Sequence, residues 1–182
     1  MNEKKKNSRM GRAIRYASIF LITAVATFTQ GCNRSRVYSR YCHIGKEGWE
    51  RTDTMRYMAH VNPLFPYTSQ KEREALAGKK AICQTWVELR VHGEYPYQNI
   101  ALAVKQCVYP QKLQWCDTLS CSLVNERGVF SGNGVGALQY RFPLRRMELT
   151  DTDSIEVRIS HIMKKETLQG ILDVGFSLER VD

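Results

Sequence analysis

The clearest signal for covalent chemistry in the sequence is the pair Gly31-Cys32. They follow a charge-free run from Tyr16 to Thr29, and a stretch rich in Lys and Arg, from Lys4 to Arg15, precedes that run. A cationic start, an apolar middle of roughly 7–15 residues and a small residue at the cut are typical of a secretory signal. Lipoprotein signal peptidase needs a small residue before the cut and, after it, a cysteine whose thiol already carries diacylglycerol. We therefore expect removal of residues 1–31 and lipid attachment at Cys32.

Two other interpretations of this segment stay open. A membrane-spanning helix needs about 20 apolar residues, and the run reaches that length only if Ala13 and Ile14 are recruited across Arg15. An uncleaved signal anchor is therefore the second interpretation, and a secreted protein with Cys32 in a disulfide is the third. The segment also departs from the usual signal, because Thr29 stands where leucine is common. The lipoprotein interpretation is favoured.

The charge of the chain does not indicate a nucleic-acid partner. The formal net charge is +9, but the signal holds six cations and one anion, so the mature chain keeps only +4. Such a modest, scattered charge is not the basic patch that nucleic-acid binding requires. A hydrophobic fraction of 43% over 182 residues indicates one globular domain. The sequence identifies no small-molecule substrate.

Five cysteines follow Cys32, at positions 42, 83, 107, 116 and 121. Export permits disulfides, but an odd number cannot pair completely, and the pairing stays open. Zinc sites usually show two closely spaced ligand pairs, whereas Cys42-His43 is the only adjacency in this chain. We expect no metal and no cofactor other than the diacylglycerol and N-acyl chain on Cys32.

The glycine-rich stretch 128–136 could suggest a phosphate loop. It lacks the Gly-Lys-Ser/Thr ending, and the residues after it alternate as in a strand, so no helix N-terminus would face a phosphate. A tight turn or bulge is the better interpretation. Because the sequence also lacks a recognisable catalytic triad or carboxylate pair, we expect a protein that is not an enzyme.

Period-two alternation of apolar residues predicts strands with one buried face along most of the mature chain. On the strand 81–92, Val87 and Leu89 are expected to face inward and Glu88 outward. On the last strand, Leu172, Val174, Phe176 and Leu178 are expected inward. The link 93–99 makes either a β-hairpin or a connection that crosses between sheets. Ser69 and Glu72 have capping-box spacing, which predicts a short surface helix over 70–77. The expected strands are 37–41, at an edge, then 53–61, 81–92, 100–108, 118–124, 138–142, 154–162 and 171–181.

About seven short strands without a βαβ rhythm predict an all-β fold, an antiparallel β-sandwich that is Ig-like or jelly-roll-like. We expect the sandwich domain to span 51–182 and residues 32–50 to form a lipidated tether.

Aromatic residues at turns suggest an interaction surface. Tyr95 and Tyr97 flank Pro96, so an extended backbone would send both rings to the same side. With Trp115 they form the expected surface, and with Trp49 they could make a stacking platform for sugars. Aromatic rings at such turns more commonly cover the end of a sandwich.

Three short motifs carry a family resemblance: residues 94–100 (EYPYQNI), Arg141-Phe142-Pro143, and residues 171–176 (ILDVGF). The chain resembles the GldH family of gliding-motility lipoproteins over most of 32–182, although its 66–80 link is longer and its extra cysteines are unusual for that family. The resemblance implies a non-enzymatic accessory lipoprotein of the gliding machinery. It would be held to the membrane by its lipid and would contact other envelope proteins.

The expected location is the cell envelope, at the outer membrane, facing the periplasm or the surface. Two other functions stay open at this point: a lipid-tethered carbohydrate-binding module and an enzyme that uses a cysteine thiol. The second has little support, because no cysteine pair has the C-x-x-C spacing that lowers a thiol pKa.

Overall fold

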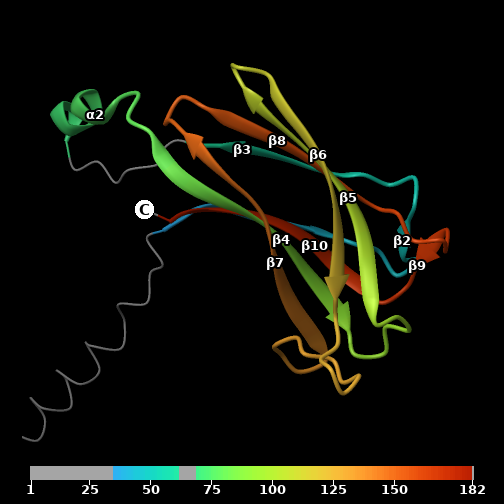
Figure 1. Cartoon of the computed structure of the whole chain (residues 1–182). Helices are drawn as coiled ribbons and strands as arrows, with labels where there is room; N and C mark the ends of the chain where they lie inside the picture. The colour runs from blue at the N-terminus through green and yellow to red at the C-terminus, as the bar shows by residue number, and fades with distance from the viewer. Residues whose placement is uncertain (1–34, 62–68, 182) are drawn as a thin grey trace, which may run out of the picture. The chain divides into compact units, whose positions relative to one another are not determined.

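Alternating apolar side chains turn most of the chain into strands with one buried face, and these strands form two four-stranded antiparallel sheets (Figure 1). The computed structural model describes residues 35–61 and 69–181. The predicted signal, Cys32 and residues 62–68 lie outside the described residues. The fold class predicted from the sequence is confirmed.

The strands divide between the sheets as follows. Sheet 1 has the order β1-β10-β4-β7, made of Arg36–His43, Ile171–Arg180, Ala81–His92 and Ala137–Leu149. Sheet 2 has the order β3-β8-β5-β6, made of Met55–His60, Ser154–His161, Asn99–Tyr109 and Leu113–Ser122. The two-residue strands β2, Trp49–Glu50, and β9, Thr167–Leu168, pair with each other.

The strand pairing identifies the architecture as a jelly roll. β5 pairs with β6, β4 with β7, β3 with β8, and β1 with β10, all antiparallel. These are the pairs of one long hairpin, with its tip at β5–β6, that has been rolled so that its pairs alternate between two sheets. Of the two architectures expected from the sequence, this order excludes the Ig-like one, which groups its strands differently.

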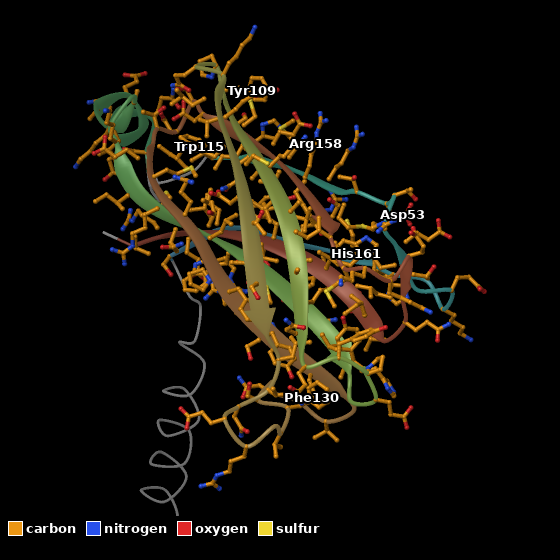
Figure 2. All side chains as sticks on the ribbon, turned by 45° about the vertical axis from the view of Figure 1, so that its right-hand side comes forward. Asp53, Tyr109, Trp115, Phe130, Arg158 and His161 are labelled. Atoms are coloured by element: carbon orange, nitrogen blue, oxygen red, sulfur yellow. The ribbon has the colours of Figure 1, made fainter. Side chains whose placement is uncertain are left out.

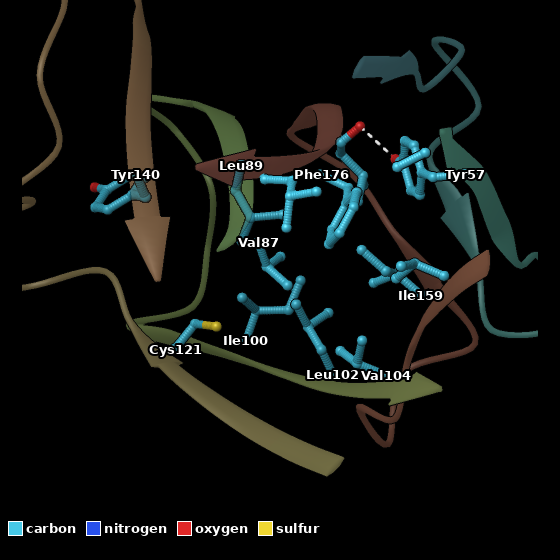
Figure 3. Packing of buried hydrophobic residues seen from close by; sticks show 14 of the residues in the cluster. Tyr57, Val87, Leu89, Ile100, Leu102, Val104, Cys121, Tyr140, Ile159 and Phe176 are labelled. Carbon is cyan, nitrogen blue, oxygen red and sulfur yellow. Dashed lines mark hydrogen bonds between the residues drawn. The ribbon is translucent and has the colours of Figure 1, made fainter. Parts of the chain in front are cut away.

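The core lies between the two sheets, where the predicted inward residues meet (Figure 3). Val87 and Leu89 of sheet 1 and Ile100, Leu102 and Val104 of sheet 2 are fully buried. The Tyr57 hydroxyl donates to the Val174 carbonyl at 2.7 Å, so the one polar atom of that buried ring is satisfied.

The predicted tether at 32–50 is corrected by the structure. β1 pairs with β10 along seven residue pairs, and β2 pairs with β9, so both belong to the folded unit that begins at Ser35. The edge strand expected at 37–41 is present and longer. Its alternation was visible, but the polar residues around it hid the fact that it completes sheet 1.

The structure decides one open alternative and moves two strand boundaries by several residues. The link 93–98 crosses from sheet 1 to sheet 2, so the hairpin alternative is wrong. β6 begins at Leu113, five residues before its predicted start. β7 continues through Pro143 to Leu149. Proline has no N–H to donate, and an edge strand such as β7 tolerates this because it has a neighbouring strand on one side only.

A bulge changes one face assignment, and the helix agrees with its prediction. The register of β10 shifts between Ile171 and Asp173, so Ile171 is 2% exposed while Leu172, predicted inward, is only half-buried. The helix α2, Gln70–Leu76, is capped by Ser69, whose Oγ accepts from the Glu72 N–H at 3.3 Å. Within residues 35–61 and 69–181, no helix has the length and apolar character needed to cross a membrane.

Candidate interaction surface

The outward side chains of sheet 1 lie in rows that run across all four strands. Antiparallel pairing sets Tyr41, Gly175, Glu88 and Arg141 side by side in the central row. The rows on either side are Ser39, Ser177, Trp86 and Pro143, and His43, Asp173, Arg90 and Gln139. We call these twelve residues the sheet 1 outer face. It carries cations and anions in alternation together with two aromatic rings.

Glu88 is the unexpected member of this face. Its outward direction agrees with the prediction, but the residue is only 1% exposed. A buried carboxylate is stable only when its oxygens are paired and hydrogen-bonded. Oε1 accepts from the Ser177 hydroxyl at 2.5 Å and faces Arg141 Nε at 3.3 Å, while Oε2 accepts from the Tyr41 hydroxyl. The carboxylate of Glu88, on β4, is thus bound by side chains from the other three strands of the sheet.

Arg141 connects this carboxylate to a second one. Its Nη2 lies 2.7 Å from Oε2 of Glu179, which is 7% exposed, and Arg36 Nε lies 3.3 Å from the other oxygen of Glu179. The guanidinium therefore forms ion pairs with two carboxylates at once, a geometry that the planar arginine head supports and lysine does not. The network fixes the side chains of the sheet 1 outer face before any partner arrives.

The Tyr41 ring lies flat across the sheet because its neighbour is a glycine. A Cβ on Gly175 would lie 2.6 Å from Cε1 and 2.7 Å from Cδ1 of Tyr41, closer than non-bonded carbon atoms approach. Burial, and then the hydrogen bond to Glu88, raise the pKa of Tyr41 to about 12. Tyr41 therefore remains a neutral donor at any physiological pH.

Two arginines lie over the two aromatic rings of the face. The Arg141 guanidinium carbon is 4.0 Å from the centre of the Trp86 ring, and that of Arg90 is 4.7 Å from the centre of the Tyr41 ring. Arg90 also faces Asp173 at 3.5 Å. Trp, Tyr and Arg are the residues that most often dominate protein–protein binding energy. Among the described residues, the Trp86 Nε1 atom is a buried donor without an acceptor.

The structure does not assemble the interaction surface predicted from the sequence. Tyr95 is only 3% exposed and packs edge to face on Tyr97, with ring centres 5.4 Å apart. Trp115 lies on β6 of sheet 2, where it pairs with Gln106 of β5. Gln106 is seven residues from Asn99, the start of β5, which places Trp115 about 23 Å from the end of the strand that follows Tyr95 and Tyr97. Figure 2 labels Trp115, and the Arg145 guanidinium carbon lies 5.3 Å from the centre of its ring. Burial also removes Trp49, at 0% exposure, from the sugar platform.

The five described cysteines contain no disulfide. Cys42, Cys107, Cys116 and Cys121 carry thiols that are not in disulfides, and Cys83 is fully buried in the core. Burial raises the pKa of the Cys121 thiol to about 12, so this thiol is unreactive. In the part of the chain that the structure describes, no three His, Cys, Asp or Glu side chains gather as metal ligands would.

Sequence reasoning missed the sheet 1 outer face, although two of its own motifs pointed there. Arg141 of the Arg-Phe-Pro motif and Gly175 of the 171–176 motif flank Glu88 in the central row. The available signal was Glu88, an acid at the centre of the strand 81–92 between the apolar Val87 and Leu89. Their convergence depends on the order of strands, which the sequence left open.

Comparisons with known proteins find relatives that cover nearly the whole chain. The chain aligns with the gliding motility lipoprotein GldH of Flavobacterium johnsoniae at 24% identity, over 93% of this chain and 99% of that one. It aligns with the gliding motility lipoprotein GldH homolog of Christiangramia forsetii at 23% identity, over 91% and 96%. Among solved structures, that of Eiger TNF from S. frugiperda covers 81% of this chain and 94% of that one, at 9% identity. Its TM-score of 0.32 is too low to establish a shared fold.

The fold and the ordered face define a jelly-roll domain, and the two relatives that cover nearly its whole length are named as a gliding motility lipoprotein and its homolog. The family described as GldH lipoprotein matches residues 75–178, which run from the end of α2 through most of β10. The chain therefore belongs to the GldH lipoprotein family, and the resemblance inferred from the three motifs is confirmed.

Proposed function

We propose that this chain is a lipid-anchored, non-enzymatic component of the gliding machinery in the cell envelope, and that it acts by binding other envelope proteins through the sheet 1 outer face. The family match over residues 75–178 is the observation that carries this proposal. The two curated relatives, both named as gliding motility lipoproteins or homologues, align over nearly their whole length, so the match is not limited to one motif.

The site of anchoring supports an interaction role close to a membrane. If Cys32 is acylated, only Asn33 and Arg34 separate it from Ser35, the residue at which the folded unit begins. The chain between them can reach roughly 11 Å. The sandwich would then bind its partners at the membrane surface, which we propose to be the outer membrane, rather than at the end of a flexible tether.

The sheet 1 outer face has the properties expected of the contact surface. Its side chains are fixed in advance by the bonds to Glu88 and Glu179, and pre-organisation lowers the entropic cost of binding. Its arginines remain reachable, since the side chains of Arg90 and Arg141 are 47% and 31% exposed. A partner with acidic and aromatic groups would find matching donors and ring faces here.

The test is affinity capture of the lipidated protein from its native envelope, quantified by mass spectrometry. Wild type is compared with Arg90→Ala, which removes one exposed anchor of the face, and with Lys46→Gln, an exposed cation elsewhere. We expect envelope proteins captured by wild type and Lys46→Gln to fall about ten-fold with Arg90→Ala, the loss of one anchor worth roughly 1.4 kcal/mol. Equal capture by all three proteins, each with an unchanged melting temperature, would show that the face is not the contact surface.

The carbohydrate-binding alternative makes the opposite prediction. It requires the wild-type protein to bind a glycan and to lose that glycan when a surface aromatic is removed. Since Trp49 and Tyr95 are buried, the platform on which that alternative was based is not available in the described structure. We expect no binding across a glycan panel, and a glycan that binds wild type but not a folded Tyr97→Ala protein would favour this alternative.

A further inference from the structure

The outer face of sheet 2 holds three cations in one row. Arg56 on β3 pairs directly with Arg158 on β8, and Arg158 pairs directly with Lys105 on β5. Neighbouring strands are about 4.8 Å apart, and like charges placed directly opposite one another destabilise a sheet. All three residues are exposed, so the row is open to solvent. A row of this kind lowers stability unless something compensates for its charge.

The protein itself compensates for only part of that charge. Glu156 lies two residues before Arg158 on β8, and its Oε1 accepts from Arg158 at 2.7 Å. The Arg158 hydrogen bond lowers the pKa of Glu156, which also accepts from the Tyr109 hydroxyl at 3.3 Å. Within residues 35–61 and 69–181, Arg56 and Lys105 have no carboxylate within 4.0 Å. Three cations and one anion leave a local charge of +2.

The row separates two hollows on the same face. A groove of about 550 Å³ is lined by Lys105, Arg158, Glu156 and Tyr109 on one side of the row. A smaller hollow of about 170 Å³ is lined by Arg56, Lys105, Arg158 and the hydroxyl-bearing Ser160. Lys105 and Arg158 line both hollows, and Arg56 joins them in the smaller one, so a group bound in the smaller hollow would contact all three cations. Figure 2 shows Arg158 and Tyr109 on this side of the molecule.

We propose that this row, Arg56, Arg158 and Lys105, is a binding site for a doubly charged tetrahedral oxyanion of the phosphate type. The uncompensated charge of +2 would balance the −2 charge of a phosphate dianion. Two guanidinium groups and an ammonium are the donors that bind phosphate best, since arginine donates two parallel hydrogen bonds and lysine adds a point charge. The site lies on the sheet opposite the sheet 1 outer face, so it does not depend on the proposed protein contacts.

The phosphate group could belong to a membrane lipid or to a small soluble molecule, and one titration separates them. The full lipidated chain in non-ionic detergent micelles is unfolded by heat with added inorganic phosphate. A second series uses micelles doped with phosphatidic acid, and doping with phosphatidylcholine is its control. A melting temperature raised by inorganic phosphate assigns a soluble oxyanion, and one raised only by phosphatidic acid assigns a lipid headgroup. Sodium chloride at equal ionic strength corrects for screening.

Variants decide whether the row is responsible. Lys105→Gln and Arg56→Gln should each weaken the protection by about ten-fold in ligand concentration, while Lys46→Gln should leave it unchanged. Without ligand, Lys105→Gln should melt at the same or a higher temperature than wild type, because it relieves repulsion in the row. A merely structural lysine would not show this combination.

Three results would overturn the proposal. The first is no protection beyond that given by sodium chloride. The second is equal protection of wild type, Lys105→Gln and Arg56→Gln, which would place any bound anion elsewhere. The third is stronger protection by a poly-glutamate peptide than by either phosphate source, which would assign the row to an acidic protein segment.

Discussion

At the scale of single residues, the sheet 1 outer face depends on a small residue beside a large one. Gly175 leaves room for the Tyr41 ring, and the ring carries the hydroxyl that donates to Glu88. Motif reasoning found Gly175 without a reason for it, because the clash it avoids is with a residue 134 positions away on the edge strand. A contact of this kind is set by register and cannot be deduced from local pattern.

Gly175→Ala should therefore destabilise the domain by about 1–3 kcal/mol, since the added methyl overpacks against the Tyr41 ring. The same change in a Tyr41→Ala background should cost less, because the ring is gone. Chemical denaturation of the four proteins of this cycle measures the coupling. Gly93→Ala is the matched control, since a Cβ there meets no atom within 4 Å. A coupling of zero would show that the ring does not lie on Gly175.

His161 predicts a pH dependence of stability. The residue is 1% exposed, and burial lowers its pKa below the ordinary 6.5, so the folded protein keeps it neutral. The unfolded chain binds a proton as the pH falls below 6.5, and stability must decrease there. This stability is therefore complete above pH 6.5 and is lost as the pH falls.

The measurement is the free energy of unfolding between pH 7 and pH 5.5. We expect wild type to lose up to about 1.4 kcal/mol per pH unit more than His161→Gln, the limit for one proton. The glutamine amide can still donate to the Trp49 carbonyl, which faces His161 Nε2 at 3.0 Å. Parallel pH profiles for the two proteins would contradict the assignment.

At the scale of elements, the alternation of apolar residues predicted most of the core residues but not the order of the strands in the sheets. Val87, Leu89, Val174 and Phe176 are buried as expected, since a period of two is a local property. The path of β7 was not predictable in the same way. Pro143 suggested an end, whereas the strand continues because it lies at an edge, and edges are set by the whole sheet. The face on which Glu88 is buried depended on the same strand order.

The bulge that follows Pro143 gives a test at this scale. Leu144 and Arg145 together oppose Thr85, whose hydroxyl accepts from the Arg145 N–H at 3.1 Å and donates to its carbonyl at 3.0 Å. Thr85→Val leaves both backbone groups without this partner, which should cost about 1–3 kcal/mol. Thr118→Val on the exposed face of β6 is the control and should be nearly neutral. Equal denaturation midpoints for the two variants would mean that the hydroxyl does not stabilise the bulge.

At the scale of the whole molecule, the predicted lipid position and the start of the fold are almost adjacent. The sequence predicted a tether of 19 residues, 32–50, but strand β1 begins at Arg36. This correction could not come from pattern, because β1 is polar on its exposed side and short of apolar residues. Its consequence is that a lipid on Cys32 should hold the sandwich domain directly at the membrane surface.

Cys32→Ser should abolish labelling with radioactive palmitate and leave a larger chain that keeps its signal. The shift in size and the loss of label are read on one gel. A Cys42→Ser protein is the control, since Cys42 lies inside β1 and no apolar run precedes it. A Cys32→Ser protein that still takes up label at the wild-type size would contradict the lipoprotein assignment.

The central claim, that the sheet 1 outer face binds an envelope protein, is tested most directly by photo-crosslinking in living cells. A benzoylphenylalanine is placed at His43, whose side chain is 75% exposed in the third row of that face, or at Thr118, exposed on the outer face of sheet 2. The account predicts that illumination joins the His43→benzoylphenylalanine protein to a distinct envelope protein and leaves the Thr118→benzoylphenylalanine protein uncrosslinked. An adduct from Thr118 alone, or the same adduct from both positions, would contradict it.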